Sequence, residues 1–245
     1  MKALILSDIH GNWEALQAVL KAEPGADQIL CLGDLVNYGP EPVQCVAWAM
    51  KILKPGWLIQ GNHDHAVGFD TDPHCSPAYQ LTAEATQLVS NRLLPGAMKK
   101  FLAELQPLQT LHLNGATCVA CHATPSDPLY HYLTEQSAPT SWESELSRAS
   151  HPAYLFLGHT HLPMKTRFQH TLVVNPGSVG QPKHGDPRAA YAVWEDDRVT
   201  LRRVTYDVER TIRAYDGLGL DPHVVQSLCA VLRTGGDPPA PARHA

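Results

Sequence analysis

Residues 3–10 read ALILSDIH, an apolar run of four residues that leads into Asp8 and His10. Four later segments follow the same plan: residues 29–34 read ILCLGD, 57–64 read WLIQGNHD, 117–122 read TCVACH and 154–161 read YLFLGHTH. A short apolar run bounded by polar residues is typical of a buried strand. Ligands in open α/β sheets bind beyond the carboxyl ends of the strands. The pattern therefore predicts that polar residues spread over about 150 positions meet at one edge.

The polar residues at the ends of these apolar runs form a set of candidate metal ligands. They are Asp8, His10, Asp34, Asn62, His122, His159 and His161, with His63 and Asp64 beside them. No thiolate is needed among them. Imidazole, carboxylate and amide oxygen together suit a pair of divalent ions.

Composition and charge set the broad class. The 245 residues are 44% hydrophobic and 18% charged, which is ordinary for a globular protein of one large or two small domains. The net charge of −5 does not indicate nucleic-acid binding. The N-terminal apolar run is too short for a signal-peptide core or a membrane span, so we expect a cytoplasmic protein without a membrane partner. The six cysteines are interpreted as reduced core residues.

The first half of the chain alternates predicted strands and helices. Asn12 is a plausible N-cap for a helix that ends at Pro24-Gly25, and Pro42 opens a second helix that Pro55-Gly56 closes. This βαβαβ pattern predicts a parallel start to the sheet. Residues 69–109 interrupt it with two predicted helices, a helical insertion that we interpret as packing against the body or covering the site as a lid.

The second half is interpreted as antiparallel. Asn114-Gly115, Gln169-His170 and Asp196-Asp197 each divide two apolar stretches and predict hairpins. Two further helices are predicted near 208–216 and 222–233, and residues 235–245 are predicted to be a disordered tail. The whole predicts an α/β fold of two stacked mixed β-sheets flanked by helices, an αββα sandwich, as a single domain over residues 1–234.

The insertion helices carry the apolar residues that sequence spacing assigns to their packing faces. Leu81, Ala85 and Leu88 mark the first helix. Met98, Phe101, Leu102 and Leu105 follow the i, i+3, i+4, i+7 spacing of one helix face in the second.

Taken in order, the five blocks resemble those of the calcineurin-like metallophosphoesterases. The resemblance spans residues 8–161 and extends to Asn175-Pro176-Gly177-Ser178, which is similar to a segment of small bacterial members, a branch described as phosphodiesterase-like or diadenosine-tetraphosphatase-like. We interpret Asn175 and Ser178 as shaping a turn at the rim of the cleft.

The resemblance implies a role for each residue. One ion would be held by Asp8, His10, Asp34 and His161, and the other by Asp34, Asn62, His122 and His159. A hydroxide between the ions would attack phosphorus in line. His63 would protonate the leaving oxygen or stabilise charge beside the phosphoryl group, and Asp64 would either steer the His63 ring or cap its own loop. By ligand type, His and carboxylate side chains suit Mn, Fe, Zn, Co or Ni, and Mn is favoured as the metal.

The second block departs from the protein phosphatases of this superfamily, which carry an Asp and an Arg where this chain has Asn37 and Tyr38. Tyr38 cannot grip a dianionic phosphate as a guanidinium does. The chain is therefore predicted to hydrolyse a small phosphodiester or nucleotide-type substrate. The alternatives are a phosphomonoesterase or protein phosphatase, and a non-catalytic metal-bound scaffold. Lys183 and Arg188 are candidate phosphate contacts.

Overall fold

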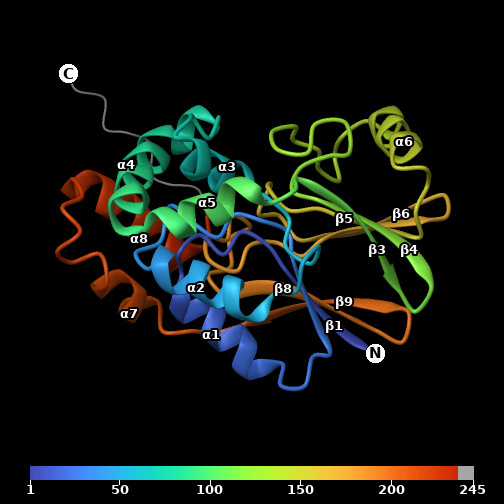
Figure 1. Ribbon diagram of the computed structural model, residues 1–245, viewed down its shortest axis with the longest axis horizontal. Helices are drawn as coiled ribbons and strands as arrows, with labels where there is room; N and C mark the ends of the chain where they lie inside the picture. The colour runs from blue at the N-terminus through green and yellow to red at the C-terminus, as the bar shows by residue number, and fades with distance from the viewer. Residues whose placement is uncertain (237–245) are drawn as a thin grey trace.

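A computed structural model describes residues 1–236, and Figure 1 shows its two sheets with helices on their outer sides. The strands are β1 (Lys2–Leu6), β2 (Gln28–Cys31), β3 (Leu108–Leu113), β4 (Ala116–Cys121), β5 (Tyr154–Phe156), β6 (Met164–Phe168), β7 (Thr171–Asn175), β8 (Ala189–Glu195) and β9 (Arg198–Val204). The helices are α1 (Trp13–Ala22), α2 (Pro42–Ile52), α3 (Asn62–Phe69), α4 (Pro77–Leu93), α5 (Gly96–Glu104), α6 (Pro139–Arg148), α7 (Val208–Arg213) and α8 (Pro222–Thr234). The tail predicted for 235–245 lies outside the described residues from 237 onward.

The strands form two mixed sheets, which confirms the predicted fold class. One sheet has the order β2-β1-β8-β9 and the other the order β3-β4-β5-β7-β6. β1 and β2 are parallel, and the three predicted hairpins are present as the antiparallel pairs β3–β4, β6–β7 and β8–β9. The prediction of an antiparallel second half is wrong for β4–β5 and β5–β7, which are parallel. The sequence reading missed α6, the helix that lies between β4 and β5 along the chain and provides the crossover that parallel strands need.

Alternation along β1 divides the core into layers. Ala3 and Ile5 belong to the cluster between the two sheets, where they pack with Phe156 and Trp194. Leu4 and Leu6 belong to the cluster between the four-stranded sheet and its helices. Successive side chains of a strand point to opposite faces, so one strand serves both layers. The site at its carboxyl end therefore starts from a rigid base.

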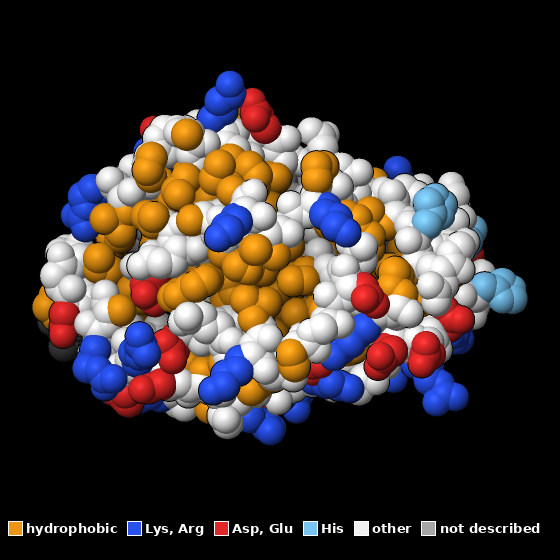
Figure 2. Space-filling model, turned by 60° about the horizontal axis from the view of Figure 1, so that its bottom comes forward, with side chains coloured by type: hydrophobic (Ala, Val, Ile, Leu, Met, Phe, Trp, Pro, Cys, Tyr) orange, Lys and Arg blue, Asp and Glu red, His pale blue; other side chains and the backbone are white. Residues whose placement is uncertain are grey.

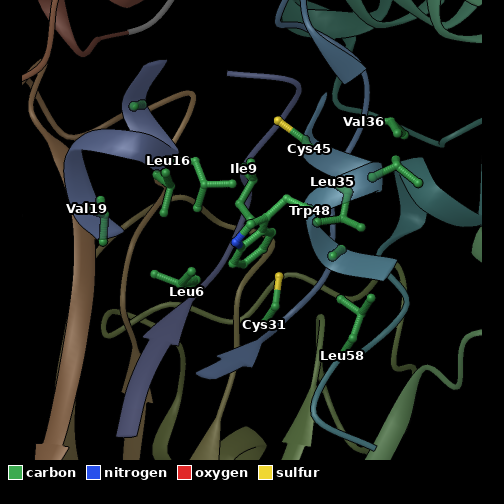
Figure 3. Close-up of a cluster of buried hydrophobic side chains, with 14 of the residues drawn as sticks. Leu6, Ile9, Leu16, Val19, Cys31, Leu35, Val36, Cys45, Trp48 and Leu58 are labelled. Carbon is green, nitrogen blue, oxygen red and sulfur yellow. The ribbon is translucent and has the colours of Figure 1, made fainter. Parts of the chain in front are cut away.

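The helices of the first half begin where the sequence predicts. The Asn12 side chain accepts a hydrogen bond from the backbone N–H of Ala15 and caps α1, and Pro42 occupies the first turn of α2. Trp48 of α2 packs among Leu16, Leu35 and Leu58 in the cluster that Figure 3 shows. These contacts bury the apolar faces of α1 and α2 against β1 and β2.

The third apolar run forms no strand. Leu58 and Ile59 make isolated parallel bridges to Cys31 and Gln106, and α3 begins at Asn62, only three residues later. The run is too short to extend the sheet before the helix starts. Its position beside β2 still brings Asn62 to the edge where β1 and β2 end.

The predicted apolar face of α4 is wrong for Leu81 and Leu88, which are 65% and 72% exposed, whereas Ala85 is partly buried against the core. The helix buries Tyr79, Ala83 and Val89 together with Thr82, Thr86 and Ser90. Thr86 Oγ1 accepts a hydrogen bond from the backbone N–H of Tyr38 at 2.9 Å, and Ser90 Oγ accepts one from Asn37 N–H at 3.3 Å. The inner face of α4 therefore combines apolar side chains with hydroxyl acceptors for the loop after β2.

The predicted packing face of α5 is confirmed. Leu102 is fully buried, and Met98, Phe101 and Leu105 pack against the same cluster as α1 and α2. Figure 2 shows that hydrophobic side chains also gather in the middle of one outer face of the molecule, among scattered lysines and arginines. Within residues 1–236, no helix combines the length and apolar character that crossing a membrane requires.

Candidate metal centre

The seven predicted ligands come together in the structure. Asp8 and His10 follow β1, Asp34 follows β2, His122 follows β4, His159 and His161 follow β5, and Asn62 opens α3. All seven are at most 3% exposed. Among the described residues, three groups offer nitrogen and oxygen atoms that lie within 4.8 Å of one another and could hold an ion. They are Asp8, His10 and His161; Asp8, Asp34 and His122; and His10, Asp34 and His63.

Three of the imidazoles are held by backbone carbonyls. Nδ1 of His10 lies 2.9 Å from Val36 O, Nδ1 of His122 lies 2.7 Å from Leu32 O, and Nδ1 of His161 lies 2.5 Å from Gln181 O. A carbonyl oxygen can only accept, so Nδ1 carries the proton in each ring. In the neutral ring Nε2 then presents a lone pair to the centre, which is the arrangement of a metal-ligating histidine.

His159 and Asn62 complete the second side of the centre. Nε2 of His159 donates to Tyr130 O at 3.2 Å, so its Nδ1 faces inward, 3.2 Å from Asn62 Oδ1. The Asn62 amide donates to Pro73 O at 2.7 Å, which aims Oδ1 at Nε2 of His122, 3.0 Å away. Both side chains thus present lone pairs to the same space.

The two carboxylates are buried among these lone pairs. Neither oxygen of Asp8 has a hydrogen-bond partner, although Oδ1 lies 3.2 Å from Nε2 of His161, because the His161 proton is on Nδ1. Asp34 Oδ2 lies 3.6 Å from Nε2 of His10 and 3.2 Å from Nε2 of His122, so it faces both sides of the centre. A buried carboxylate without donors is unstable unless a cation compensates it. The donor set therefore fits divalent ions.

The charges of the centre shift the ionisation of its members. Burial lowers the pKa of His10 and His159 well below the usual value. Burial opposes protonation of His122 as well, but the carboxylates of Asp34 and Asp8 overcome it and raise the pKa of this ring to about 9. The same negative field that attracts a proton to Nε2 of His122 would attract a divalent cation, so metal and proton compete for this nitrogen.

The backbone at the centre is strained. Five of the proposed ligands have φ between 48° and 64°, the left-handed region that residues other than glycine rarely adopt: Asp8, His10, Asp34, His159 and His161. Such residues cost about 1 kcal/mol or more each and persist where the surrounding structure fixes them. Sequence patterning gave no sign of this strain.

Gly33 and Gly61 allow two of the loops to touch. A Cβ on Gly61 would overlap Oδ1 of Asp34, and a Cβ on Gly33 would lie 2.5 Å from the backbone nitrogen of Gly61. The glycines that precede Asp34 and Asn62 in the sequence are therefore required by close approach of the loops.

His63 lies next to the centre with its ring held by other groups. The Asn37 amide donates to Nδ1 at 2.9 Å, and Nε2 lies 3.3 Å from Cys75 Sγ. This arrangement leaves the proton on Nε2. Although burial opposes protonation, the neighbouring Cys75 and Asp34 raise the pKa of His63. His63 therefore presents a proton toward the pocket.

The hydrogen bonds of Asp64 favour the second of the two roles that the sequence left open. Its carboxylate accepts hydrogen bonds from the backbone N–H groups of Asp34 and Leu35, both at 2.8 Å, and of Gly61 at 3.1 Å. Burial and the charge of Asp34 raise the pKa of Asp64 to about 7, yet its three partners are all donors, which an ionised carboxylate satisfies best. Asp64 ties two loops together, and the group that orients His63 is Asn37.

A narrow pocket opens beside His63 and contains residues that the sequence analysis missed. Cys75, Tyr79 and Tyr132 line it together with Tyr38 and Lys183. The interpretation of all six cysteines as core residues is wrong for Cys75, which is partly exposed. No spacing in the sequence links Cys75, Tyr79 and Tyr132 to the metal blocks, because they reach the pocket from the helical insertion and from the loop after His122.

Two other expectations were resolved nearby. Asn175 donates to Gly158 O and accepts from Gly177 N–H, and Ser178 donates to Asp8 O, so both shape a turn as predicted. Arg188 lies outside the pocket and forms a forked ion pair with Asp186.

Comparisons with known proteins agree with this geometry. Residues 1–198 match the profile of the calcineurin-like phosphoesterase superfamily domain. The chain is 27% identical to the uncharacterized protein MJ0912 of Methanocaldococcus jannaschii, over 84% of this chain and 88% of the relative. It is 25% identical to phosphodiesterase YfcE of Escherichia coli, over 82% and 91%. A crystal structure of a metallophosphoesterase from Sphaerobacter thermophilus superposes with a TM-score of 0.77 at 29% identity, covering 96% of this chain and 99% of the other.

Proposed function

The chain belongs to the calcineurin-like phosphoesterase superfamily, and we propose that it is a dinuclear-metal-dependent enzyme for a phosphodiester or nucleotide-type substrate. Its family makes it a hydrolase of phosphoesters, and the finer assignment rests on one observation. Both oxygens of the buried Asp8 carboxylate lack a hydrogen-bond partner, and Oδ2 of Asp34 lies within 3.6 Å of the Nε2 atoms of His10 and His122, whose Nδ1 atoms donate to backbone carbonyls. Divalent cations would compensate the negative charge of this site, and the oxygen and nitrogen atoms would serve as their ligands.

The proposed ligands divide into two sets. Asp8, His10, Asp34 and His161 would hold one ion, and Asp34, Asn62, His122 and His159 would hold the other. The position of Asp34 Oδ2 between the Nε2 atoms of His10 and His122 supports a bridging role. When bound, the ions would supply Lewis acidity and an activated water for in-line attack on phosphorus.

The proposed proton donor is His63. Its Nε2 carries a proton because the Asn37 amide occupies Nδ1, and Nε2 borders the pocket where a leaving oxygen would emerge. In the structure, Nε2–H of His63 donates to Cys75 Sγ. A substrate oxygen would replace the thiol as the acceptor.

The proposed substrate class follows from the second block. Tyr38 carries no charge, and its hydroxyl donates to Cys75 Sγ at 3.4 Å. The absence of a guanidinium weakens the binding of a dianionic monoester more than that of a monoanionic diester, because the monoester carries twice the charge. The phosphodiesterase name of one relative agrees with this preference. A cytoplasmic location remains a prediction.

A metal-by-substrate matrix tests the proposal. Protein stripped with a chelator is loaded with Mn, Fe, Zn, Co or Ni, and the bound metal is quantified by elemental analysis. Each form is then assayed with an aryl phosphodiester, an aryl phosphomonoester, a dinucleoside polyphosphate and a phosphoserine peptide. We expect two equivalents of metal and the highest kcat/KM on a diester or dinucleotide, with Mn favoured.

Two results would contradict the proposal in different ways. A higher kcat/KM on the phosphopeptide than on every diester and dinucleotide would favour the protein-phosphatase alternative. Two bound ions without turnover of any phosphoester would favour the scaffold alternative.

A further inference from the structure

We propose that Lys183 binds the phosphoryl group of the substrate and supplies the cation that the second block lacks. The inference rests on the proposed function and names the group that recognises the substrate's charge. By the resemblance of the second block, Tyr38 takes the position of an arginine in protein phosphatases, and its hydroxyl donates to Cys75 Sγ instead. Lys183 reaches the same pocket from a segment almost 150 residues further along the chain.

Lys183 is placed by a loop that is tied to the metal centre. The loop follows β7, and its Gly180 N–H donates to Asp8 O at 3.0 Å. The carbonyl of Gln181, two residues before Lys183, accepts the Nδ1 proton of His161. The loop is thus bonded to residues of one proposed metal site, so the position of Lys183 is coupled to that of the ligands.

The lysine is the one cationic side chain of this pocket. Among the described residues that line it, Lys183 alone is a Lys or Arg, and it shares the pocket with Asp34, His63 and His161. Its Nζ lies 3.8 Å from the ring centroid of Tyr79 and 6.0 Å from that of Tyr38. The cation–π contact holds the ammonium group over the pocket wall, which reduces the entropy lost when it binds an anion.

Lys183 lines the pocket together with His161, a proposed metal ligand, and His63, the proposed proton donor. An anionic phosphoryl group bound between these residues would be attracted by the ammonium group.

Binding of inorganic phosphate to Mn-loaded protein tests the inference without relying on turnover. Titration calorimetry gives the Kd for phosphate, and assays with an aryl diester and an aryl monoester give kcat and KM. Lys183→Met should weaken phosphate binding by about 10–100-fold, the range of one lost charge-assisted hydrogen bond. It should lower kcat/KM more for the dianionic monoester than for the diester. Lys183→Arg keeps the charge and should bind phosphate more tightly than Lys183→Met.

Arg188→Met is the matched control in the same loop. Arg188 pairs with Asp186 outside the pocket, so the Kd for phosphate should stay within about twofold of wild type. A Kd within twofold of wild type for Lys183→Met would overturn the inference, as would an equal loss in Arg188→Met. If wild-type protein with bound metal neither binds phosphate nor turns over any phosphoester, the proposed function itself is wrong, and this inference falls with it.

Discussion

Replacing Asp64 with Asn separates its two roles, because a steering residue and a loop tie respond differently. Oδ2 of Asp64 accepts two backbone N–H groups and Oδ1 accepts a third. An Asn side chain keeps one oxygen and turns the other position into a donor. If the amide oxygen takes the Oδ2 position, the amide NH₂ group takes the Oδ1 position. The backbone N–H of Leu35, which now donates to the charged Oδ1, would then face another donor.

The expected cost follows from these contacts. A hydrogen bond to a charged group contributes about 1.5–3 kcal/mol, and a buried donor left unpaired costs about 1–3 kcal/mol. The two figures overlap, so we expect Asp64→Asn to lower the free energy of unfolding by about 2–4 kcal/mol. For a chain of this size that corresponds to a fall in Tm of roughly 4–16 °C.

Thermal unfolding at pH 8 with a chelator present measures this cost without a contribution from bound metal. The pH lies above the raised pKa of Asp64, so the wild-type carboxylate is ionised. Asp197→Asn, in an exposed turn, is the control and should change stability by less than about 0.5 kcal/mol. The reasoning is refuted if Asp64→Asn unfolds like wild type and binds both metals but loses activity 100-fold or more, since Asp64 would then act on His63.

Three further substitutions address the metals and the proton donor. Asp34→Asn should weaken both metal sites and remove most activity, because one carboxylate faces both; full metal content with normal turnover would argue against the bridge. His63→Gln should keep both metals and lower kcat by roughly 10²–10⁴, with a smaller loss for substrates that have acidic leaving groups; loss of one ion would make His63 a ligand. Asn37→Asp should place a carboxylate at the Asn37–His63 contact, raise the pKa of His63 and move the alkaline limb of the pH–rate profile to higher pH; an unchanged limb would exclude His63 as the titrating acid.

The sequence predicted the strand ends well because each apolar run stops at a polar residue with a chemical use. β1, β2, β4 and β5 all end within three residues of a proposed ligand. Local patterning failed where the structure depends on contacts between distant segments. The buried face of α4 includes Thr86 and Ser90, whose hydroxyl groups pair with the loop after β2, and apolar spacing cannot reveal such contacts. Cys75, Tyr79 and Tyr132 were missed for the same reason, since only the fold brings them to His63.

The loop from Asp34 to Tyr38 connects the buried face of α4 with the pocket beside His63. Asp34, Asn37 and Tyr38 have positive φ, and their backbone N–H groups are hydrogen-bonded to Asp64, Ser90 and Thr86. The acceptors come from α3 and α4, so the helical insertion stabilises the strained loop that carries the proposed bridging carboxylate and the group that orients His63. Lifting α4 as a lid would break the hydrogen bonds of two backbone N–H groups, at about 0.5–1.5 kcal/mol each, and would expose the apolar side chains that α4 buries. We therefore interpret α4 as part of the foundation of the site, and any opening motion should begin in the segment around Cys75 that precedes it.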